Sequence, residues 1–345
     1  MYYFSTFISG FQDIVKSLIG QMLKDVEIVN IFDGIVLYKT SATPETIRTI
    51  KIFNNSFMLL GRYQIPADKT PDYIVKQFLG SSKDIGGVTQ SEIDKGRYKT
   101  FRVVSSHRNQ LYSTDRVLLK KVEEKILKNT NLSVDRLNPD VEFWFLTRSE
   151  GIGLFGMRIT KHQSYDKVLQ KGELRPELAN LMCWLSEPSS DDVFLDPFCG
   201  YGSIPFERSG IAGYRRIMAS DIDKEKLRAV AAKLQSTTNR SNILVSADDF
   251  LKIAAPKHLV INKIVTDPPW GDYEKMSVET VKFYEVFLQK CSELLAPGGI
   301  LVFISSCKSE IDEALKKLPP KLALEQSYDI LVSGKKARIY KFINN

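Results

Sequence analysis

The chain has 345 residues, of which 43% are hydrophobic and 26% are charged, and its formal net charge is +7. This composition is typical of a globular protein with two or three hydrophobic cores, and it argues against intrinsic disorder. The longest apolar runs, such as residues 300–304, are far shorter than the ~18 residues of a membrane-spanning helix, so no membrane association is predicted.

Cysteine and histidine usage argues against a metalloprotein and against a disulfide framework. The four cysteines include no CxxC pair, and the three histidines are scattered along the chain. We therefore expect reduced thiols and no metal site. Residues 1–5 lack the basic start and the small-residue cleavage site of a secretory signal, so the predicted compartment is the cytoplasm.

The first 80 residues combine strand and helix signals. Hydrophobic patterns predict strands over residues 2–9, 26–29, 34–38 and 56–60 and helices over residues 11–23 and 71–78. Asp33 and Gly34 supply the turn signal between the second and third of these strands. Glycines and serines in residues 80–87 then mark a break. These signals predict a small α+β domain over residues 1–80.

A second α+β unit is predicted over residues 81–160. A strand is expected over residues 100–104, followed by a helix over residues 116–127 that Asp115 could cap. A turn over residues 132–140 leads to a strand over residues 141–146.

Positive charge is concentrated in this second unit. Residues 95–128 contain ten Lys or Arg and three acidic residues, an excess of seven that equals the net charge of the chain. Such a segment suggests an RNA partner, whose phosphates would make the affinity salt-dependent. The alternative is a solvated helix face over residues 120–128. The candidate RNA-binding residues are Lys99, Arg102, Arg108, Arg116 and Lys120.

Residues 161–174 form a polar connector, and Pro176 lies near the first turn of the helix that follows. We therefore predict a third domain over residues 175–345. Its strands are expected over residues 193–195, 216–220, 242–246, 263–266 and 300–305, with a helix over residues 279–295 and a turn over residues 297–299.

Acidic residues follow the first four of these strands. They are Asp196, Asp221, the pair Asp248 and Asp249, and Asp267. Because parallel strands present their carboxyl ends at one edge of a doubly wound sheet, these acids describe a nucleoside-binding crevice.

The first acid begins the segment Asp196-Pro197-Phe198-Cys199-Gly200-Tyr201-Gly202-Ser203, which leads into a helix from Ile204. Glycines at such a turn allow a ligand to lie against the backbone, although the third glycine of a dinucleotide fingerprint is absent. Cys199 lies inside the turn, where a small side chain suffices, so we do not assign it as a nucleophile.

The last acid begins the loop Asp267-Pro268-Pro269-Trp270-Gly271. A carboxylate at a strand end, proline-adjacent carbonyls and an indole face can hold a flat base by its exocyclic amine. In isolation such a segment is usually only a turn. Its position after the fourth strand favours amino-group chemistry on a nucleobase, with Asp267, Pro268, Pro269 and Trp270 as the candidate catalytic residues.

The constellation of strand-end acids and the glycine turn resembles the class I S-adenosylmethionine-dependent methyltransferases. Upstream, the segments Phe101-Arg102-Val103, Ser113-Thr114-Asp115, Val134-Asp135 and Asn138-Pro139-Asp140-Val141-Glu142 resemble a THUMP domain, an RNA-binding module of RNA-modifying enzymes. The opening unit resembles the ferredoxin-like domain that precedes it. Together with the Asp-Pro-Pro-Trp-Gly loop, these segments resemble the THUMP-containing tRNA guanine-N2 methyltransferases.

This resemblance implies an α/β fold with a Rossmann-like methyltransferase domain on a mostly parallel seven-stranded sheet. It also implies the cofactor S-adenosylmethionine, with Asp196, Gly200 and Gly202 at its methionine end, Asp221 at the ribose and Asp248 at the adenine. The predicted domains are a ferredoxin-like domain (1–80), a THUMP-like domain (81–160), a linker (161–174) and a methyltransferase domain (175–345). The candidate cofactor-binding residues are Asp196, Phe198, Cys199, Gly200, Gly202, Ser203, Asp221, Ile222, Asp248, Asp249 and Asp267.

The predicted activity is methylation of the exocyclic amine of a guanosine in tRNA. Trp270 departs from the family pattern, which commonly has Tyr or Phe there, and this leaves the target base less certain than the reaction. Alternatives are a ribosomal RNA guanine-N2 methyltransferase, an adenine-N6 methyltransferase acting on RNA, and a catalytically silent RNA-binding protein. A monomer is expected, and the sequence leaves open whether a small activating subunit is required.

Overall fold

The computed structural model describes residues 1–66, 68–82, 85, 89, 92–93, 98–160, 169–235, 242–252, 260–270, 280–332 and 334–345. In this part of the chain the fold divides into two compact units, which we call the first unit (Met1–Phe7 and Ile19–Gln163) and the second unit (Ile8–Leu18 and Ser164–Asn345). No helix in the described ranges is long and apolar enough to cross a bilayer.

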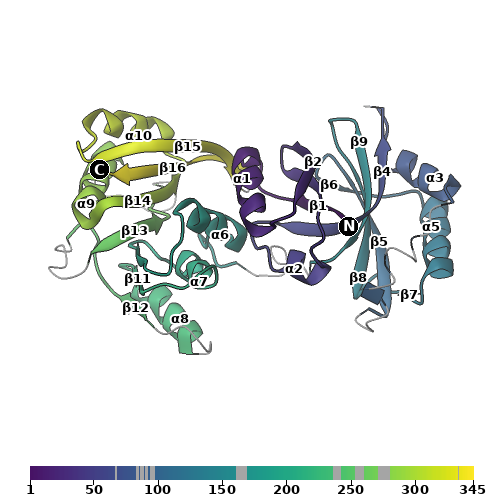
Figure 1. The fold of residues 1–345 in the computed structure, drawn as a ribbon, viewed down its shortest axis with the longest axis horizontal. Helices are drawn as coiled ribbons and strands as arrows, with labels where there is room; N and C mark the ends of the chain where they lie inside the picture. The colour runs from purple at the N-terminus through teal and green to yellow at the C-terminus, as the bar shows by residue number, and fades with distance from the viewer. Residues whose placement is uncertain are drawn as a thin grey trace. The chain divides into compact units, whose positions relative to one another are not determined.

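The first unit is built on a sheet of nine strands among its described residues, in the order β2-β3-β1-β4-β9-β8-β5-β6, with β7 paired to β5 (Figure 1). The strands are β1 (Tyr2–Thr6), β2 (Glu27–Phe32), β3 (Ile35–Lys39), β4 (Asn55–Gln64), β5 (Thr100–His107), β6 (Gln110–Tyr112), β7 (Ser133–Val134), β8 (Val141–Thr147) and β9 (Ile152–Arg158). Because β4 pairs antiparallel with β9, residues 1–80 and 81–160 contribute strands to the same sheet. Their division into ferredoxin-like and THUMP-like domains stays a prediction.

The helices of the first unit are α2 (Pro44–Arg48), α3 (Pro71–Gly80) and α5 (Arg116–Asn129) in its described residues. Asp115 caps α5 as predicted, because its Oδ1 accepts hydrogen bonds from the amides of Val117 and Leu118, each at 3.0 Å. Farther along α5, Lys125 Nζ donates to Phe78 O at 2.7 Å and so binds a carbonyl at the C-terminal end of α3. The Lys125 contact ties α5, which carries much of the basic segment, to α3.

The second unit contains a seven-stranded sheet in its described residues, in the order β12-β11-β10-β13-β14-β16-β15. The strands are β10 (Val193–Asp196), β11 (Arg216–Ser220), β12 (Ile243–Ser246), β13 (Ile261–Thr266), β14 (Leu295–Ser305), β15 (Leu322–Val332) and β16 (Lys335–Asn344). The pairings from β12 to β14 are parallel, and those of β16 with β14 and β15 are antiparallel. The predicted mostly parallel seven-stranded α/β sheet is confirmed.

Helices cover both faces of this sheet. They are α6 (Pro176–Leu185), α7 (Ser203–Ser209), α8 (Lys224–Gln235), α9 (Thr280–Leu294) and α10 (Lys308–Ala314) in the described ranges (Figure 1). Leu301 and Phe303 of β14 pack in one hydrophobic cluster with Phe287 of α9 and Ile311 of α10. Because side chains alternate along a strand, Val302 points to the opposite face, and α6 contacts β14 as well.

Two features of the second unit differ from the sequence prediction. The turn predicted over residues 297–299 lies inside β14, where the chain bulges because the pairing jumps from Ile261–Leu295 to Lys263–Ile300. Residues 8–18, which include the first part of α1 (Gln12–Met22), belong to the second unit. A Cβ at Gly10 would lie 2.2 Å from Asp329 O, so only glycine fits this close approach to β15.

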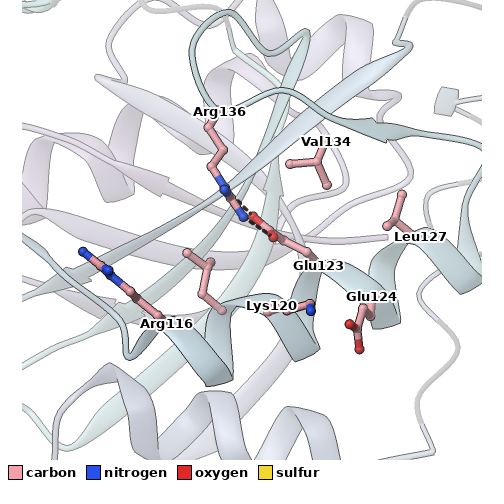
Figure 2. A pocket seen from close by; sticks show the side chains of 8 residues that line it. Arg116, Lys120, Glu123, Glu124, Leu127, Val134 and Arg136 are labelled. Carbon is pink, nitrogen blue, oxygen red and sulfur yellow. Dashed lines mark hydrogen bonds and ion pairs between the residues drawn. The ribbon is translucent and has the colours of Figure 1, made fainter.

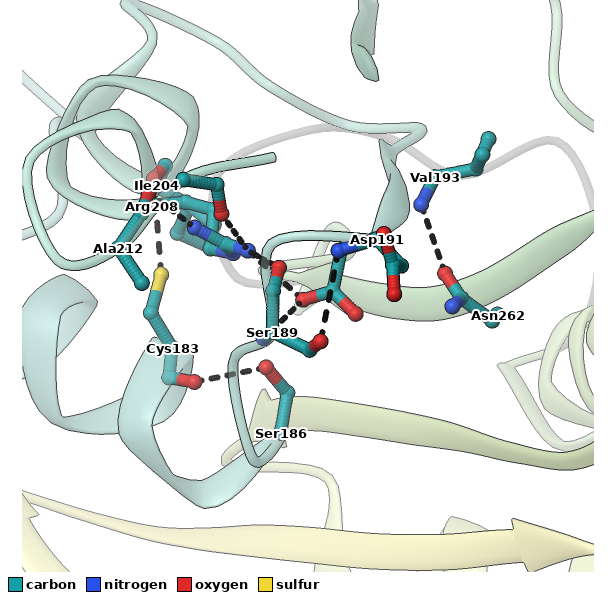
Figure 3. A network of polar contacts seen from close by, with 11 residues as sticks. Cys183, Ser186, Ser189, Asp191, Val193, Ile204, Arg208, Ala212 and Asn262 are labelled. Carbon is teal, nitrogen blue, oxygen red and sulfur yellow. Dashed lines mark hydrogen bonds and ion pairs between the residues drawn. The ribbon is translucent and has the colours of Figure 1, made fainter. Parts of the chain in front are cut away.

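A buried ion pair fixes the beginning of β10 (Figure 3). Arg208 of α7 donates through Nη2 to Asp192 Oδ2 at 2.7 Å, and both side chains are 0% exposed. The same guanidinium donates to the carbonyls of Ser189 at 2.8 Å and Ala212 at 3.2 Å. The start of β10 is thus held through Asp192, at the end of the strand opposite to Asp196.

We predict that Asp192→Ala lowers the free energy of unfolding by about 3–5 kcal/mol, because it leaves the Arg208 guanidinium buried without its carboxylate. Denaturant titration followed by tryptophan fluorescence would measure the change. Lys316→Ala is the matched control, since it removes an ion pair to Glu313 in which both side chains are exposed. Equal unfolding midpoints for Asp192→Ala and wild type would contradict this account.

Candidate active site

The chain order reverses between β10 and β13, which lie side by side at the centre of the second sheet. In open α/β sheets, ligands bind at the carboxyl ends of the strands on either side of such a switch point. Asp196 is the last residue of β10, and Asp267 immediately follows β13. The two acids therefore lie at the edge where a ligand is expected.

The glycine turn after β10 is shaped by backbone requirements. Gly202 has φ +83° and lies at the N-terminus of α7, where a Cβ would come within 2.8 Å of the Phe206 ring. Gly200 has φ +50°, and a Cβ there would meet no described atom within 4 Å. Gly202 is thus packed against the protein, whereas Gly200 borders open space that a ligand can fill.

Asp221 holds this turn in place from the end of β11. Its Oδ2 accepts a hydrogen bond from the Gly200 amide at 2.8 Å, and its Oδ1 accepts one from the Asp223 amide at 2.9 Å. The adjacent Ile222 is 69% exposed and offers an apolar surface beside this carboxylate. Each carboxylate oxygen has a second lone pair, which remains suited to a ribose hydroxyl.

Asp196 is buried and is tied to β13. Thr266 Oγ1 donates to Asp196 Oδ1 at 2.7 Å, and the Phe198 amide donates to the same oxygen at 3.3 Å. Among the described residues, no donor bonds the buried Asp196 Oδ2. Burial is the main cause that raises the pKa of this carboxyl well above its usual range, and the nearby Asp267 and Asp221 raise it further.

Asp267 lies one residue beyond Thr266, half-buried at the start of the Asp-Pro-Pro-Trp loop. Its Oδ1 accepts a hydrogen bond from Trp270 Nε1 at 2.7 Å. Burial raises the pKa of Asp267 to about 7, and the bond from Trp270 opposes this shift. Gly271, the last residue of the predicted loop, lies outside the described residues.

The remaining predicted cofactor residues have separate environments. Phe198 packs its ring 5.6 Å from that of Phe250, within the core beneath the site. Asp249 accepts a hydrogen bond from the Leu251 amide at 3.1 Å, and Asp248 is exposed beyond the end of β12. Burial raises the pKa of the Cys199 thiol, which makes it a poor nucleophile.

Two polar residues of this region were missed by the sequence reasoning. Thr266 ends a predicted strand, where a small β-branched residue carries no functional signal. Glu173 lies in the predicted connector, and its Oε1 accepts a hydrogen bond from Ser203 Oγ at 3.4 Å, at the first residue of α7. Thirty residues separate the two along the chain, so no local pattern relates them.

The predicted RNA-binding residues of the first unit do not form one cluster. Arg102 Nε donates to Glu142 Oε1 at 2.7 Å, and Arg108 lies exposed at the turn between β5 and β6. The amide of Lys99 donates to Asp140 Oδ2 at 2.8 Å. Arg116 and Lys120, both on the exposed side of α5, line one groove with Arg136, whose carbonyl accepts a hydrogen bond from Arg102 Nη1 at 3.5 Å.

Arg116 and Lys120 line a groove with a volume of about 600 Å³ between α5 and the segment around Val134 (Figure 2). Leu127 and Val134 give it apolar surface. Its other charged residues include Arg136, which donates to both oxygens of Glu123, at 3.0 and 2.7 Å.

The second unit meets the chemical requirements of S-adenosylmethionine. Asp196 Oδ2 is a buried acceptor suited to a cationic group, Gly200 leaves room against the backbone, and Asp221 and Ile222 offer a carboxylate and an apolar surface one strand away. Together with the sheet order, these features define a class I S-adenosylmethionine-dependent methyltransferase.

Comparisons with known proteins agree with this class. The family model described as the RMKL-like methyltransferase domain, UPF0020, matches residues 163–330. A tRNA (guanine(10)-N2)-dimethyltransferase of Methanocaldococcus jannaschii is 24% identical over 329 residues, covering 87% of this chain and 90% of that protein. A probable enzyme of the same name from Methanothermococcus thermolithotrophicus is 32% identical over 149 residues, which are 41% of this chain and 87% of that protein.

The crystal structure of TrmN from Thermus thermophilus aligns with 100% of this chain and 99% of its own, with a TM-score of 0.77 at 20% identity. That likeness concerns the fold. The sequence relatives place the chain in a family: the protein belongs to the tRNA guanine-N2 methyltransferases that carry an RMKL-like methyltransferase domain.

We predict that S-adenosylhomocysteine, whose ammonium group is cationic, releases protons from the protein when it binds. A cation beside Asp196 favours the carboxylate, so binding lowers a pKa that burial has raised. Calorimetric titrations in two buffers of different ionisation enthalpy, repeated across pH, would count the protons. Asp196→Asn should reduce the release, and a buffer-independent enthalpy for wild type across that pH range would refute the prediction.

Proposed function

We propose that this enzyme transfers a methyl group from S-adenosylmethionine to the exocyclic N2 amine of a guanosine in tRNA. One observation carries the proposal. The Thr266–Asp196 hydrogen bond joins the acid at the cofactor turn to the residue beside Asp267, so the proposed donor and acceptor sites lie side by side at the ends of β10 and β13.

When bound, S-adenosylmethionine supplies an electrophilic methyl group on a sulfonium. The lone pair of the guanine amine is delocalised into the ring, so the protein must hold and orient this amine before it can react. In the proposed mechanism Asp267 accepts one N–H of the amine and the Pro268 carbonyl accepts the other, while Trp270 offers its face to the base. The proton that the nitrogen loses passes to Asp267 or, through it, to solvent.

The remaining cofactor contacts belong to the same proposal. Gly200, Gly202 and Ser203 would border the methionine moiety, with Asp196 facing its ammonium. Asp221 would accept from the ribose, the exposed Ile222 would pack against the adenine, and Asp248 would accept its amine. Phe198 would support the glycine turn by packing against the core. Phe198 and Cys199 would shape the pocket without bonding to the cofactor.

We propose guanosine in tRNA as the substrate because the relatives named above are tRNA guanine-N2 enzymes. Adenine-N6 methylation of RNA poses the same chemical problem to an Asp-Pro-Pro-Trp loop and remains the alternative. Nucleoside mapping by mass spectrometry of tRNA and ribosomal RNA after incubation with the enzyme would separate these substrates.

We predict that Asp267→Asn lowers methyl transfer at least about 100-fold, since the amide donates where the carboxylate accepts. Binding of S-adenosylhomocysteine should stay near the wild-type affinity, because the cofactor turn is intact. In wild type, transfer should rise with pH through about 7, the pKa of Asp267. Near-normal turnover of Asp267→Asn in an RNA methylation assay would remove Asp267 from the mechanism.

The groove on α5 is the proposed tRNA contact of the first unit. Reversing Arg116 and Lys120 to Glu should weaken tRNA binding and flatten its salt dependence, because fewer phosphates are neutralised. The double variant Lys316→Glu/Lys321→Glu, at two exposed lysines of the second unit, makes the same change in total charge and is the control. Filter binding across salt concentrations would measure both. Charge reversal at Arg102 would also break its ion pair with Glu142, so a loss of binding in that variant would have two causes. Unchanged affinity in the Arg116/Lys120 variant would exclude this groove.

A further inference from the structure

The indole of Trp270 is bonded to the acid that starts its own loop. Trp270 Nε1 lies 2.7 Å from Asp267 Oδ1 and donates to it. The two residues between them are Pro268 and Pro269, whose rings fix φ and leave this short loop little freedom. The contact is thus built into a loop whose backbone has little freedom.

A second set of contacts holds the backbone of Trp270. Cys307 Sγ donates to Trp270 O at 2.8 Å, and the Cys307 amide donates to Ser305 Oγ at 3.0 Å. Ser305 Oγ is in turn hydrogen-bonded to Tyr284 OH at 2.7 Å, so this series of hydrogen bonds reaches α9. The indole donor is therefore positioned from β14 and α9 as well as from its own loop.

This arrangement restricts what Asp267 can do. Oδ1 of Asp267 accepts the hydrogen bond from the indole, which restricts rotation of the carboxylate. In the proposed function Oδ2 is then the oxygen that accepts from the substrate amine. An N–H donor also favours the ionised form of its acceptor, against the burial that disfavours it. A phenylalanine has no such donor, and a tyrosine carries its hydroxyl at the far end of the ring.

We propose that Trp270 is a positioning residue, which orients the Asp267 carboxylate and keeps it ionised for the substrate amine, beyond any stacking on the base. The inference rests on the proposed function, since it assigns Trp270 a role toward the acceptor of that reaction.

The pKa of Asp267 makes the two roles separable. Burial raises this pKa to about 7 and the bond from Trp270 lowers it, so loss of the bond should raise it further. Among the described residues, the other titratable groups around the acid are Asp196 at the end of β10, Tyr284 on α9 and Cys307 after β14. Transfer that requires the carboxylate is lost as pH falls through its pKa, and this loss should begin at higher pH without the indole donor.

The test is Trp270→Phe, which keeps an aromatic face and removes the N–H. Single-turnover methylation of tRNA would be measured across pH with saturating RNA. We expect the midpoint of the pH profile to rise by about one unit, so that transfer falls about tenfold on the acid side while the alkaline plateau changes little. Binding of S-adenosylhomocysteine should be unchanged, which also shows that the variant is folded.

Trp144→Phe is the matched control. Trp144 Nε1 donates to Glu142 Oε2 at 2.8 Å in the first unit, so the substitution removes the same kind of bond away from Asp267. Its pH midpoint should equal that of wild type.

Two results separate failure of this inference from failure of the proposed function. A Trp270→Phe enzyme with an unchanged midpoint and a uniform loss of rate or of RNA affinity would reduce Trp270 to a stacking residue. In that case an inactive Asp267→Asn variant would still support the proposed reaction. If Asp267→Asn retained transfer, both assignments would fall.

Discussion

The hydrogen bond from Thr266 to Asp196 is the constraint on which the site depends. It joins the ends of the two central strands at the point where the chain order reverses. A displacement of β13 by one residue would turn Thr266 away from Asp196 and would move Asp267 to the other face of the sheet. The register between Leu195 and Ile264 thus sets the geometry between the two acids.

In the same sheet, the two ends of β10 carry different kinds of acidic residue. At the start of β10, Asp192 is paired with Arg208 and both are fully buried. At the end of β10, Asp196 retains an oxygen with no donor among the described residues. The buried ion pair at one end of this four-residue strand fixes its backbone, so the carboxylate at the other end has little freedom to relax.

The sequence predicted what depends on local pattern. The strand over residues 216–220 coincides with β11, and Asp115 caps α5, because alternation and capping are written in neighbouring residues. Contacts between distant segments were not predictable in this way. The Ser203–Glu173 bond and the packing of Gly10 on Asp329 join residues 30 and more positions apart. The bond between Trp270 and Asp267 is local, yet its geometry depends on Cys307, which the pattern does not reveal.

The hydrogen bonds of Asp221 order the glycine turn before any ligand binds. Both of its oxygens hold backbone amides, one of them in the glycine turn, so the turn is fixed by bonds that lie entirely within the protein. A loop ordered in advance spends no conformational entropy when its ligand arrives. In the proposed function, a turn ordered in this way would add affinity for the cofactor, because its arrival does not require the loop to fold.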